Sequence, residues 1–211
     1  MRPPAATYRI QFNSGFDFRA ARSIVEYLAD LGISDLYASP IFEARTGSPH
    51  GYDVTDPNRL NPELGGETEF NALIADLQKM GIGWLQDIVP NHMAFSPRNR
   101  MLMDVLESGP GSAYYRFFDI DWTHFYPGLR GRLMTPFLGG PYGETLSDGL
   151  IRLVYGEAGF SFTYYDWVFP LSLDTYPDLL EPGAEGSPIL KILRRLKSAR
   201  EGGDGSEAVF Q

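Results

Sequence analysis

The chain contains no cysteine, and this absence removes several kinds of chemistry. Without thiols it has no disulfide, no zinc–thiolate site and no cysteine nucleophile. Basic residues are also scarce: 27 acids stand against 18 Lys and Arg, which gives a net charge of -9. Nucleic acids and anionic membranes attract basic surfaces, so we expect neither as a partner.

Long apolar runs are missing as well. No stretch of the sequence approaches the ~18 consecutive apolar residues that a membrane-spanning helix requires. Residues 1–6 lead into polar sequence without the apolar core of a signal peptide. Together with the lack of cysteine, these observations favour a cytoplasmic protein. The length of 211 residues is sufficient for one large core or two small ones.

The first 90 residues alternate between strand and helix patterns. Residues 7–12 and 33–38 are short and β-rich, and 84–89 form an apolar run between Gly83 and Pro90 that is typical of a buried strand. Apolar positions recur with helical spacing in 17–31 and 67–80. This order predicts three parallel strands in the order one–two–three, with the helices on one side and no antiparallel strand between residues 7 and 90.

The lengths of the connections favour one α/β architecture over another. The helix-to-strand connections are tight, whereas the loop after the second strand is long, from 41 to 66. Such asymmetry is typical of a (β/α)8 TIM barrel whose upper loops carry function. A dinucleotide-binding sheet is the alternative, but residues 13–15 are not the glycine-rich turn that it requires. With only three strands, the first and third are exposed edges that invite self-association.

The pattern changes after His92. Residues 99–106 are typical of a short helix, and 114–122 are rich in aromatic side chains. Two strands, 151–155 and 160–165, are separated by a glycine-containing turn and predict a β-hairpin. The sequence therefore predicts an α+β subdomain inserted after the third strand.

These patterns divide the chain into three parts. We expect residues 7–92 to form the first part of a barrel and residues 93–181 to form the inserted subdomain. Residues 182–211 are expected to contain a helix followed by a flexible tail, because Gly and Pro separate this segment from the preceding one.

Polar side chains converge at the ends of the predicted strands. Asp87 lies within an apolar run, where a carboxylate costs several kcal/mol unless it is paired. Tyr52 and Asp53 follow the second strand, and His92 follows the third. In a parallel barrel both loops open on the same face. An aromatic ring beside two acceptors and a donor suits a pyranose, although a structural aspartate and a capping or core histidine explain the same residues.

Residues 87–92, Asp-Ile-Val-Pro-Asn-His, resemble the first sequence signature of the α-amylase family, which ends barrel strand three. Residues 32–40 resemble the strand-two signature of that family. Within it, the maltooligosyltrehalose synthases are the group that the sequence resembles, from about residue 7 to 182. The segments that carry this narrower resemblance are 7–12, 48–54, 61–66, 117–122 and 141–144.

The resemblance implies a carbohydrate site with no metal and no cofactor. Tyr52, Asp53, Asp87 and His92 are expected to bind a maltooligosaccharide, with both aspartates orienting neighbouring basic groups rather than reacting. Asn91 is expected to be structural, and so is His50.

The resemblance also implies a retaining intramolecular transglucosylation. Two carboxyl groups flank the terminal α-1,4 bond, and the released glucose is reattached through its anomeric hydroxyl as an α,α-1,1 (trehalose) end. Water must be kept from this intermediate. We therefore expect residues 93–181 to fold over the barrel mouth, with Phe118 and Trp122 helping to seal it. The alternative is that these two rings form only the internal core of that lobe.

The chain departs from the family pattern in one respect. The nucleophile, the acid/base and a third carboxylate of the family belong to signatures on strands four, five and seven, and nothing after Glu181 resembles them. The sequence thus predicts the N-terminal part of a synthase, without catalytic residues and inactive alone. The alternatives are part of an α-glucan hydrolase or a 4-α-glucanotransferase, and a non-catalytic glucan-binding module.

Overall fold

The computed structural model describes residues 3–180, which form two compact units, 3–100 and 101–180. The boundary lies eight residues after the expected one at 92/93. The predicted helix and tail of 182–211 lie outside the described residues.

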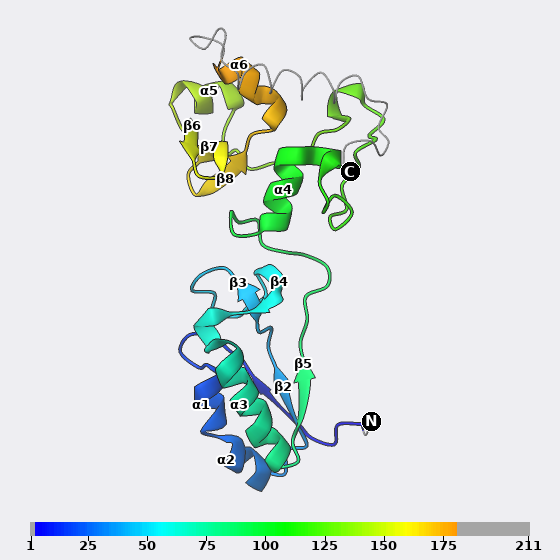
Figure 1. Ribbon diagram of the computed structural model, residues 1–211, viewed down its shortest axis with the longest axis vertical. Coiled ribbons are helices and arrows are strands. Elements are labelled where there is room, and N and C mark those ends of the chain that lie inside the picture. The colour runs from blue at the N-terminus through cyan, green and yellow to red at the C-terminus, as the bar shows by residue number, and fades with distance from the viewer. Residues whose placement is uncertain (1–2, 181–211) are drawn as a thin grey trace. The chain divides into compact units, whose positions relative to one another are not determined.

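Unit one is built on three parallel strands, β1 (Thr7–Ile10), β2 (Asp35–Ala38) and β5 (Gly83–Gln86). They lie in the order β1-β2-β5, with Arg9 opposite Tyr37 and Tyr37 opposite Leu85. The predicted parallel order is confirmed. All three strands therefore deliver their carboxyl ends to the same edge of the sheet (Figure 1).

The helices lie to one side of this sheet, as expected (Figure 1). The predicted helix 17–31 is two helices, α1 (Phe18–Arg22) and α2 (Val25–Asp30), and α3 spans Gly66–Lys79. The break falls at Ser23, whose hydroxyl donates to the Ala20 carbonyl oxygen at 2.7 Å. A serine that bonds to the preceding turn competes with the helical ladder, which the apolar spacing alone does not reveal.

One continuous core joins the sheet to the helices. Phe12 and Phe18 have ring centroids 5.3 Å apart, Phe18 lies 5.4 Å from Phe70, and Phe70 meets Trp84 edge-on at 5.4 Å. The side chains that are fully buried in this cluster come from β2, the loop after β1, η1 and all three helices: Phe12, Phe18, Ala21, Leu28, Leu36, Ala38, Leu64, Leu73 and Leu77. The predicted apolar faces of the helices thus cover the sheet.

The expectation that residues 7–90 hold no antiparallel strand is wrong. Within the predicted loop, β3 (Phe42–Ala44) and β4 (Val54–Leu60) form an irregular antiparallel pair, followed by the 3-10 helix η1 (Pro62–Leu64). Pro57 and Asn58 lie inside β4 and are typical of loops, so the sequence conceals the strand. A proline is tolerated because β4 is an edge strand. This pair is separate from the parallel sheet and lies beyond the carboxyl end of β2 (Figure 1).

The expectation of a buried strand through residue 89 is also wrong. β5 ends at Gln86, and Leu85 and Ile88 are 40% and 60% exposed. Within the described residues β5 is an outer strand of the sheet, so the edge that faces away from β2 has no partner strand. Self-association through the outer strands β1 and β5 stays a prediction.

Residues 93–100 pack on the rest of unit one, which explains why the boundary between the units lies after residue 100 and not after 92. The Ala94 N–H donates to the Val54 carbonyl oxygen at 2.8 Å. Arg98 donates to the Glu43 carboxylate at 2.9 Å, and Arg59 lies 3.4 Å from the other Glu43 oxygen. Because Glu43 is buried, these two arginines supply the charge compensation that it needs.

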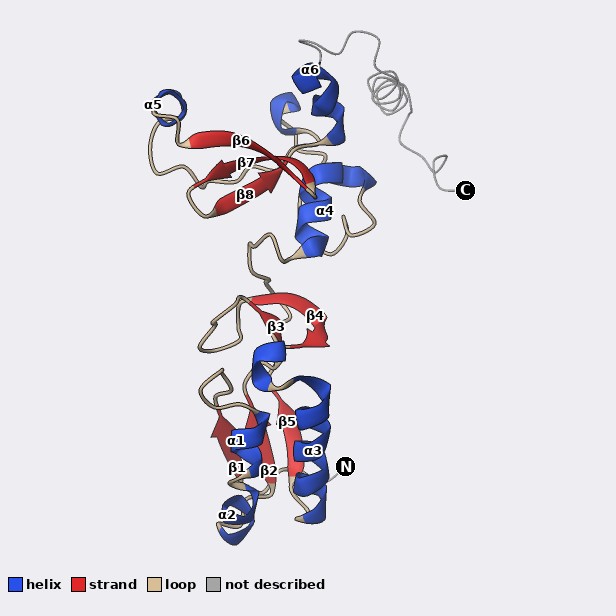
Figure 2. Ribbon diagram, turned by 60° about the vertical axis from the view of Figure 1, so that its left-hand side comes forward, coloured by secondary structure: helices blue, strands red, loops and turns tan. Residues whose placement is uncertain are grey.

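Unit two contains the predicted β-hairpin and one strand that the sequence did not indicate. β6 (Ile151–Gly156) and β7 (Gly159–Tyr164) are antiparallel as expected, and β8 (Trp167–Pro170) adds a third strand (Figure 2). The predicted helix at 99–106 is α4. The helices that involve this unit are α4 (Arg100–Ser108), η2 (Gly109–Gly111), η3 (Pro127–Leu129), α5 (Tyr142–Ser147), η4 (Leu173–Thr175) and α6 (Tyr176–Leu180).

Aromatic side chains form the interior of unit two. Phe169 lies 4.2 Å from Phe137 and 4.7 Å from Phe162, measured between ring centroids. Two tyrosine hydroxyls accept backbone N–H bonds: Tyr164 from Gly139 at 3.0 Å, and Tyr176 from Phe160 at 2.9 Å. Much of the aromatic content is therefore structural.

Replacing Phe18 by alanine should destabilise unit one by about 3–5 kcal/mol, because it empties a fully enclosed site that the rings of Phe12 and Phe70 help to line. Tyr27→Ala on α2 is the matched control, since this side chain is 57% exposed and its loss should change stability by less than about 0.5 kcal/mol. Urea unfolding followed by circular dichroism measures both. Equal midpoints for the two variants would contradict the assigned core.

Candidate functional site

Asp87 is the first residue after β5, at the edge where the parallel strands end. Its N–H donates to the Ala38 carbonyl oxygen at 2.9 Å, and its carbonyl oxygen accepts from the Gln86 side chain at 2.7 Å. Gln86 is held in turn by Trp84, whose Nε1 donates to its Oε1 at 3.1 Å. The backbone of Asp87 is thus fixed on both sides, and its carboxylate has a defined direction.

The Asp87 carboxylate is 17% exposed and has two partners. The Tyr52 hydroxyl donates to its Oδ2, and Arg9 Nη2 lies 3.6 Å from the same oxygen. Arg9 Nη2 also donates to the Tyr52 hydroxyl oxygen at 2.9 Å. The expectation that Asp87 has a partner is confirmed, and so is its contact with a basic group.

The loop that carries Tyr52 is closed by its own polar groups. Ser48 donates to the Asp53 carboxylate, and the Gly51 N–H donates to the Ser48 hydroxyl at 3.0 Å. The Tyr52 N–H donates to His50 Nδ1 at 3.0 Å. Gly51 has φ +76°, and a Cβ there would lie 2.5 Å from the Pro40 carbonyl oxygen. Only glycine permits the close approach that brings this loop to the end of β2.

The structure unites two of the four predicted site residues. Tyr52 and Asp87 are in contact, whereas the Asp53 carboxylate is turned toward Ser48 in its own loop, 3.8 Å from His50 Nδ1. His92 is exposed and makes no hydrogen bond or ion pair with any of residues 3–180. Sugar contacts by all four residues stay predictions, and the structural roles of His50 and Asn91 do too.

Sequence reasoning missed Arg9 and Gln11. Arg9 Nη1 donates to Gln11 Oε1 at 2.9 Å, and Gln11 Nε2 donates to the His50 carbonyl oxygen at 2.9 Å. A signal was present in their spacing. Residues two apart in a strand face the same side, and both lie near the carboxyl end of β1, where ligands of parallel folds bind.

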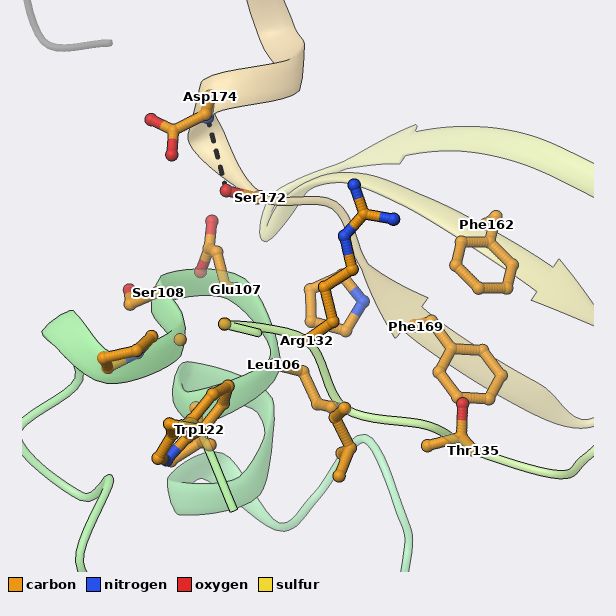
Figure 3. A pocket seen from close by; sticks show the side chains of 16 residues that line it. Leu106, Glu107, Ser108, Trp122, Arg132, Thr135, Phe162, Phe169, Ser172 and Asp174 are labelled. Atoms are coloured by element: carbon orange, nitrogen blue, oxygen red, sulfur yellow. Dashed lines mark hydrogen bonds between the residues drawn. The ribbon is translucent and has the colours of Figure 1, made fainter. Parts of the chain in front are cut away.

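The second unit holds a cavity of about 410 Å³ that none of the predicted site residues lines. Figure 3 shows the Arg132 side chain in its middle, between the segment of Ser172 and Phe169 on one side and α4 on the other. Trp122, which is predicted to help seal the reaction site, contributes to the lining of this cavity, and its buried Nε1 finds no hydrogen-bond partner among the described residues. The sealing role of Trp122 and Phe118 stays a prediction.

Two further features are absent from the described part of the chain. No group of three or more His, Cys, Asp or Glu side chains in it is arranged to hold a metal ion. None of its helices combines the length and the apolar character that crossing a membrane requires.

The sequence profile of the alpha-amylase catalytic domain matches residues 16–122, just over half of the chain. The chain belongs to the alpha-amylase family. The matched region contains all four predicted site residues and excludes β1 with Arg9. The family resemblance that the sequence motifs indicated is thereby confirmed.

Among relatives of this alpha-amylase-family chain, a putative maltooligosyl trehalose synthase of Mycobacterium tuberculosis is 44% identical over 144 residues, covering 65% of this chain. A solved maltooligosyl trehalose synthase structure covers 81% of this chain at 42% identity, with a TM-score of 0.73. The cyclomaltodextrinase of Geobacillus thermopakistaniensis is 35% identical over 112 residues, 52% of this chain.

The chain spans only 17–18% of the two curated relatives and 23% of the solved structure. The narrower resemblance to the synthases is confirmed, since both the sequence relative and the solved structure carry that name.

The hydrogen bond to the Asp87 carboxylate, followed by burial, raises the pKa of Tyr52 above its ordinary value of 10.0, and Arg9 opposes this shift. Asp87→Asn should therefore lower the pKa of Tyr52 toward 10.0, because a neutral amide no longer holds the phenol proton by charge. A pKa that is raised in the folded state also stabilises the fold below pH 10 and loses that contribution as the pH rises through it. Titration of ¹³Cζ-labelled tyrosine by NMR, with Tyr52→Phe for assignment, measures the shift. An unchanged or higher pKa in Asp87→Asn would contradict the assigned contact.

Proposed function

We propose that this chain is the N-terminal part of a maltooligosyl trehalose synthase. The complete enzyme converts the terminal α-1,4 linkage at the reducing end of a maltooligosaccharide into an α,α-1,1 linkage. The 44% identity to a putative synthase and the likeness to a solved synthase over 81% of this chain support this activity over others of the alpha-amylase family.

In this proposal β1, β2 and β5 are the first three strands of a (β/α)8 barrel, and unit two is a subdomain inserted after the third. The parallel order and the helices on one side support it, because barrel strands follow one another in this way. The remaining strands would cover the outer edges of β1 and β5. The cluster of Arg9, Tyr52 and Asp87 would then line the upper end of the barrel, where enzymes of this fold carry their active sites.

Within that site the Tyr52 ring offers an apolar face for the C–H groups of a pyranose. Asp87 and Arg9 hold its hydroxyl, so the ring is ordered before a sugar arrives. Neither Asp87 nor Asp53 acts as a nucleophile in this proposal, because both carboxylates are engaged by protein groups. His92, which is exposed and uncommitted within residues 3–180, donates a hydrogen bond to a sugar hydroxyl.

The chemistry requires two more carboxyl groups, roughly 5 Å apart, one as nucleophile and one as acid and then base. In the sequence motifs of the family these belong to later barrel strands. The 211 residues therefore supply binding and orientation, and the bond-breaking groups belong to other parts of the enzyme. The net reaction is an isomerisation, because the released glucose is returned to the same glucan.

A hydrolase of α-glucans is the second candidate, because a cyclomaltodextrinase is 35% identical over 112 residues. The identity and the matched length both favour the synthase. A 4-α-glucanotransferase and a non-catalytic glucan-binding module are the other candidates, and product analysis separates all four.

An intact enzyme that carries this sequence should consume the reducing ends of maltopentaose without shortening the chain, because each turnover converts a reducing glucose into a trehalose end. Tyr52→Ala and His92→Ala should each lower kcat more than they raise KM, since their contacts strengthen as the sugar ring flattens. Tyr155→Ala, which removes a ring that is 75% exposed on the β-hairpin of unit two, is the matched control. Reducing-sugar assays and chromatography of the products measure both quantities.

Each other outcome has a distinct meaning. New reducing ends would show a hydrolase, and longer and shorter maltooligosaccharides would show a glucanotransferase. Glucan binding without turnover by the intact protein would show a binding module. Turnover by the purified 211 residues alone would contradict the assignment of the reacting carboxyl groups to other parts of the enzyme.

A further inference from the structure

Arg9 connects three separate segments through one guanidinium group. Nη1 donates to Gln11 on its own side of the sheet at 2.9 Å, and Nη2 donates to the Tyr52 hydroxyl at 2.9 Å and lies 3.6 Å from Asp87. The guanidinium carbon also lies 5.4 Å from the centroid of the Tyr37 ring on β2. A planar fork with separate donors makes this arrangement possible, and a lysine ammonium does not reproduce it.

The contact fixes the polarity of the Tyr52 hydroxyl. This hydroxyl has one proton, which it donates to Asp87, while its oxygen accepts from Arg9. The tip of the phenol ring is therefore held from two sides by groups of opposite charge. Without Arg9, one hydrogen bond remains and the ring keeps rotational freedom about it.

Gln11 extends the same connection to the backbone of the loop. It accepts from Arg9 and donates to the His50 carbonyl oxygen at 2.9 Å. The end of β1 and the residue after it thus hold the Tyr52 loop at two points, the phenol tip through Arg9 and the main chain through Gln11. Gly51 brings the same loop against the Pro40 carbonyl at the end of β2.

We propose that Arg9 is a positioning residue, which orders the Tyr52 ring as the platform for the sugar and keeps the Asp87 carboxylate directed at the phenol rather than at the substrate. This inference rests on the proposed function, because it assigns a role within that reaction. Arg9 lies outside the region matched by the family profile, so it refines this chain's site beyond the common motifs.

The test compares Arg9→Met, Arg9→Lys and Arg19→Met in an intact enzyme that carries this sequence. Arg9→Met keeps the apolar stem and removes the fork, so kcat should fall roughly 10- to 100-fold while KM changes little, because the ring is misplaced rather than lost. Arg9→Lys should recover part of kcat, since an ammonium can donate to the phenol but cannot reach Gln11 at the same time. Arg19→Met removes an exposed arginine on α1 that pairs with Glu69 on α3 and contacts neither Tyr52 nor Asp87, so it should leave kcat unchanged.

Two measurements separate positioning from a merely structural role. Each variant is assayed well below its own melting temperature, so that a loss of kcat reflects the folded enzyme. In the 211-residue chain, Arg9→Met should also raise the pKa of Tyr52 further, because the hydrogen bond to Asp87 then acts without the opposing guanidinium. A Tyr52 pKa that does not move would overturn the assigned contact.

The outcomes distinguish this proposal from the function on which it rests. If the wild-type enzyme forms no trehalose-ended product from maltopentaose, the proposed function is wrong. If the wild type forms that product and Arg9→Met does so with a kcat within about twofold of it, the positioning role is wrong and the function stands. Arg9→Met could also lose activity only because part of the protein is unfolded. Wild-type activity of this variant well below its melting temperature would therefore overturn the positioning role as well.

Discussion

The structure of this site depends on the need to pair one half-buried carboxylate, that of Asp87. An aspartate at the end of a parallel strand loses much of its hydration and must recover it from protein groups. Tyr52 and Arg9 meet this need, and in doing so they join segments that lie 35 and 78 residues away in the sequence. The pairing therefore holds both the loop between β3 and β4 and the strand β1 against the carboxyl end of β5.

A second carboxylate, that of Glu43, fixes the segment of residues 93–100 that follows β5. It is buried between Arg59 on β4 and Arg98 beyond β5. Breaking such a pair leaves an uncompensated charge, which is the costly event in ion-pair energetics. The segment after His92 is thus anchored to the β3–β4 pair, although it has no regular secondary structure until α4 begins at Arg100.

The parallel strands and their order could be predicted because apolar spacing reports on them directly. The break at Ser23, the strand β4 with Pro57 inside it and the exposure of Ile88 could not, since each depends on side-chain hydrogen bonds or on neighbours distant in sequence. At the site, an isolated acid in an apolar run indicated a partner for Asp87. Of its two partners, Tyr52 was among the predicted site residues, whereas Arg9 was hidden because a single arginine in a strand is indistinguishable from a solvated one until the fold places it.

Tyr52 and Asp87 act as one unit in this site, and a double-mutant cycle on kcat/KM measures whether they do. Tyr52→Phe removes the donor of their hydrogen bond and Asp87→Ala removes its acceptor. The intact enzyme that carries both changes should therefore lose no more activity than the more damaged single variant. Losses that multiply, as expected for independent sites, would contradict it.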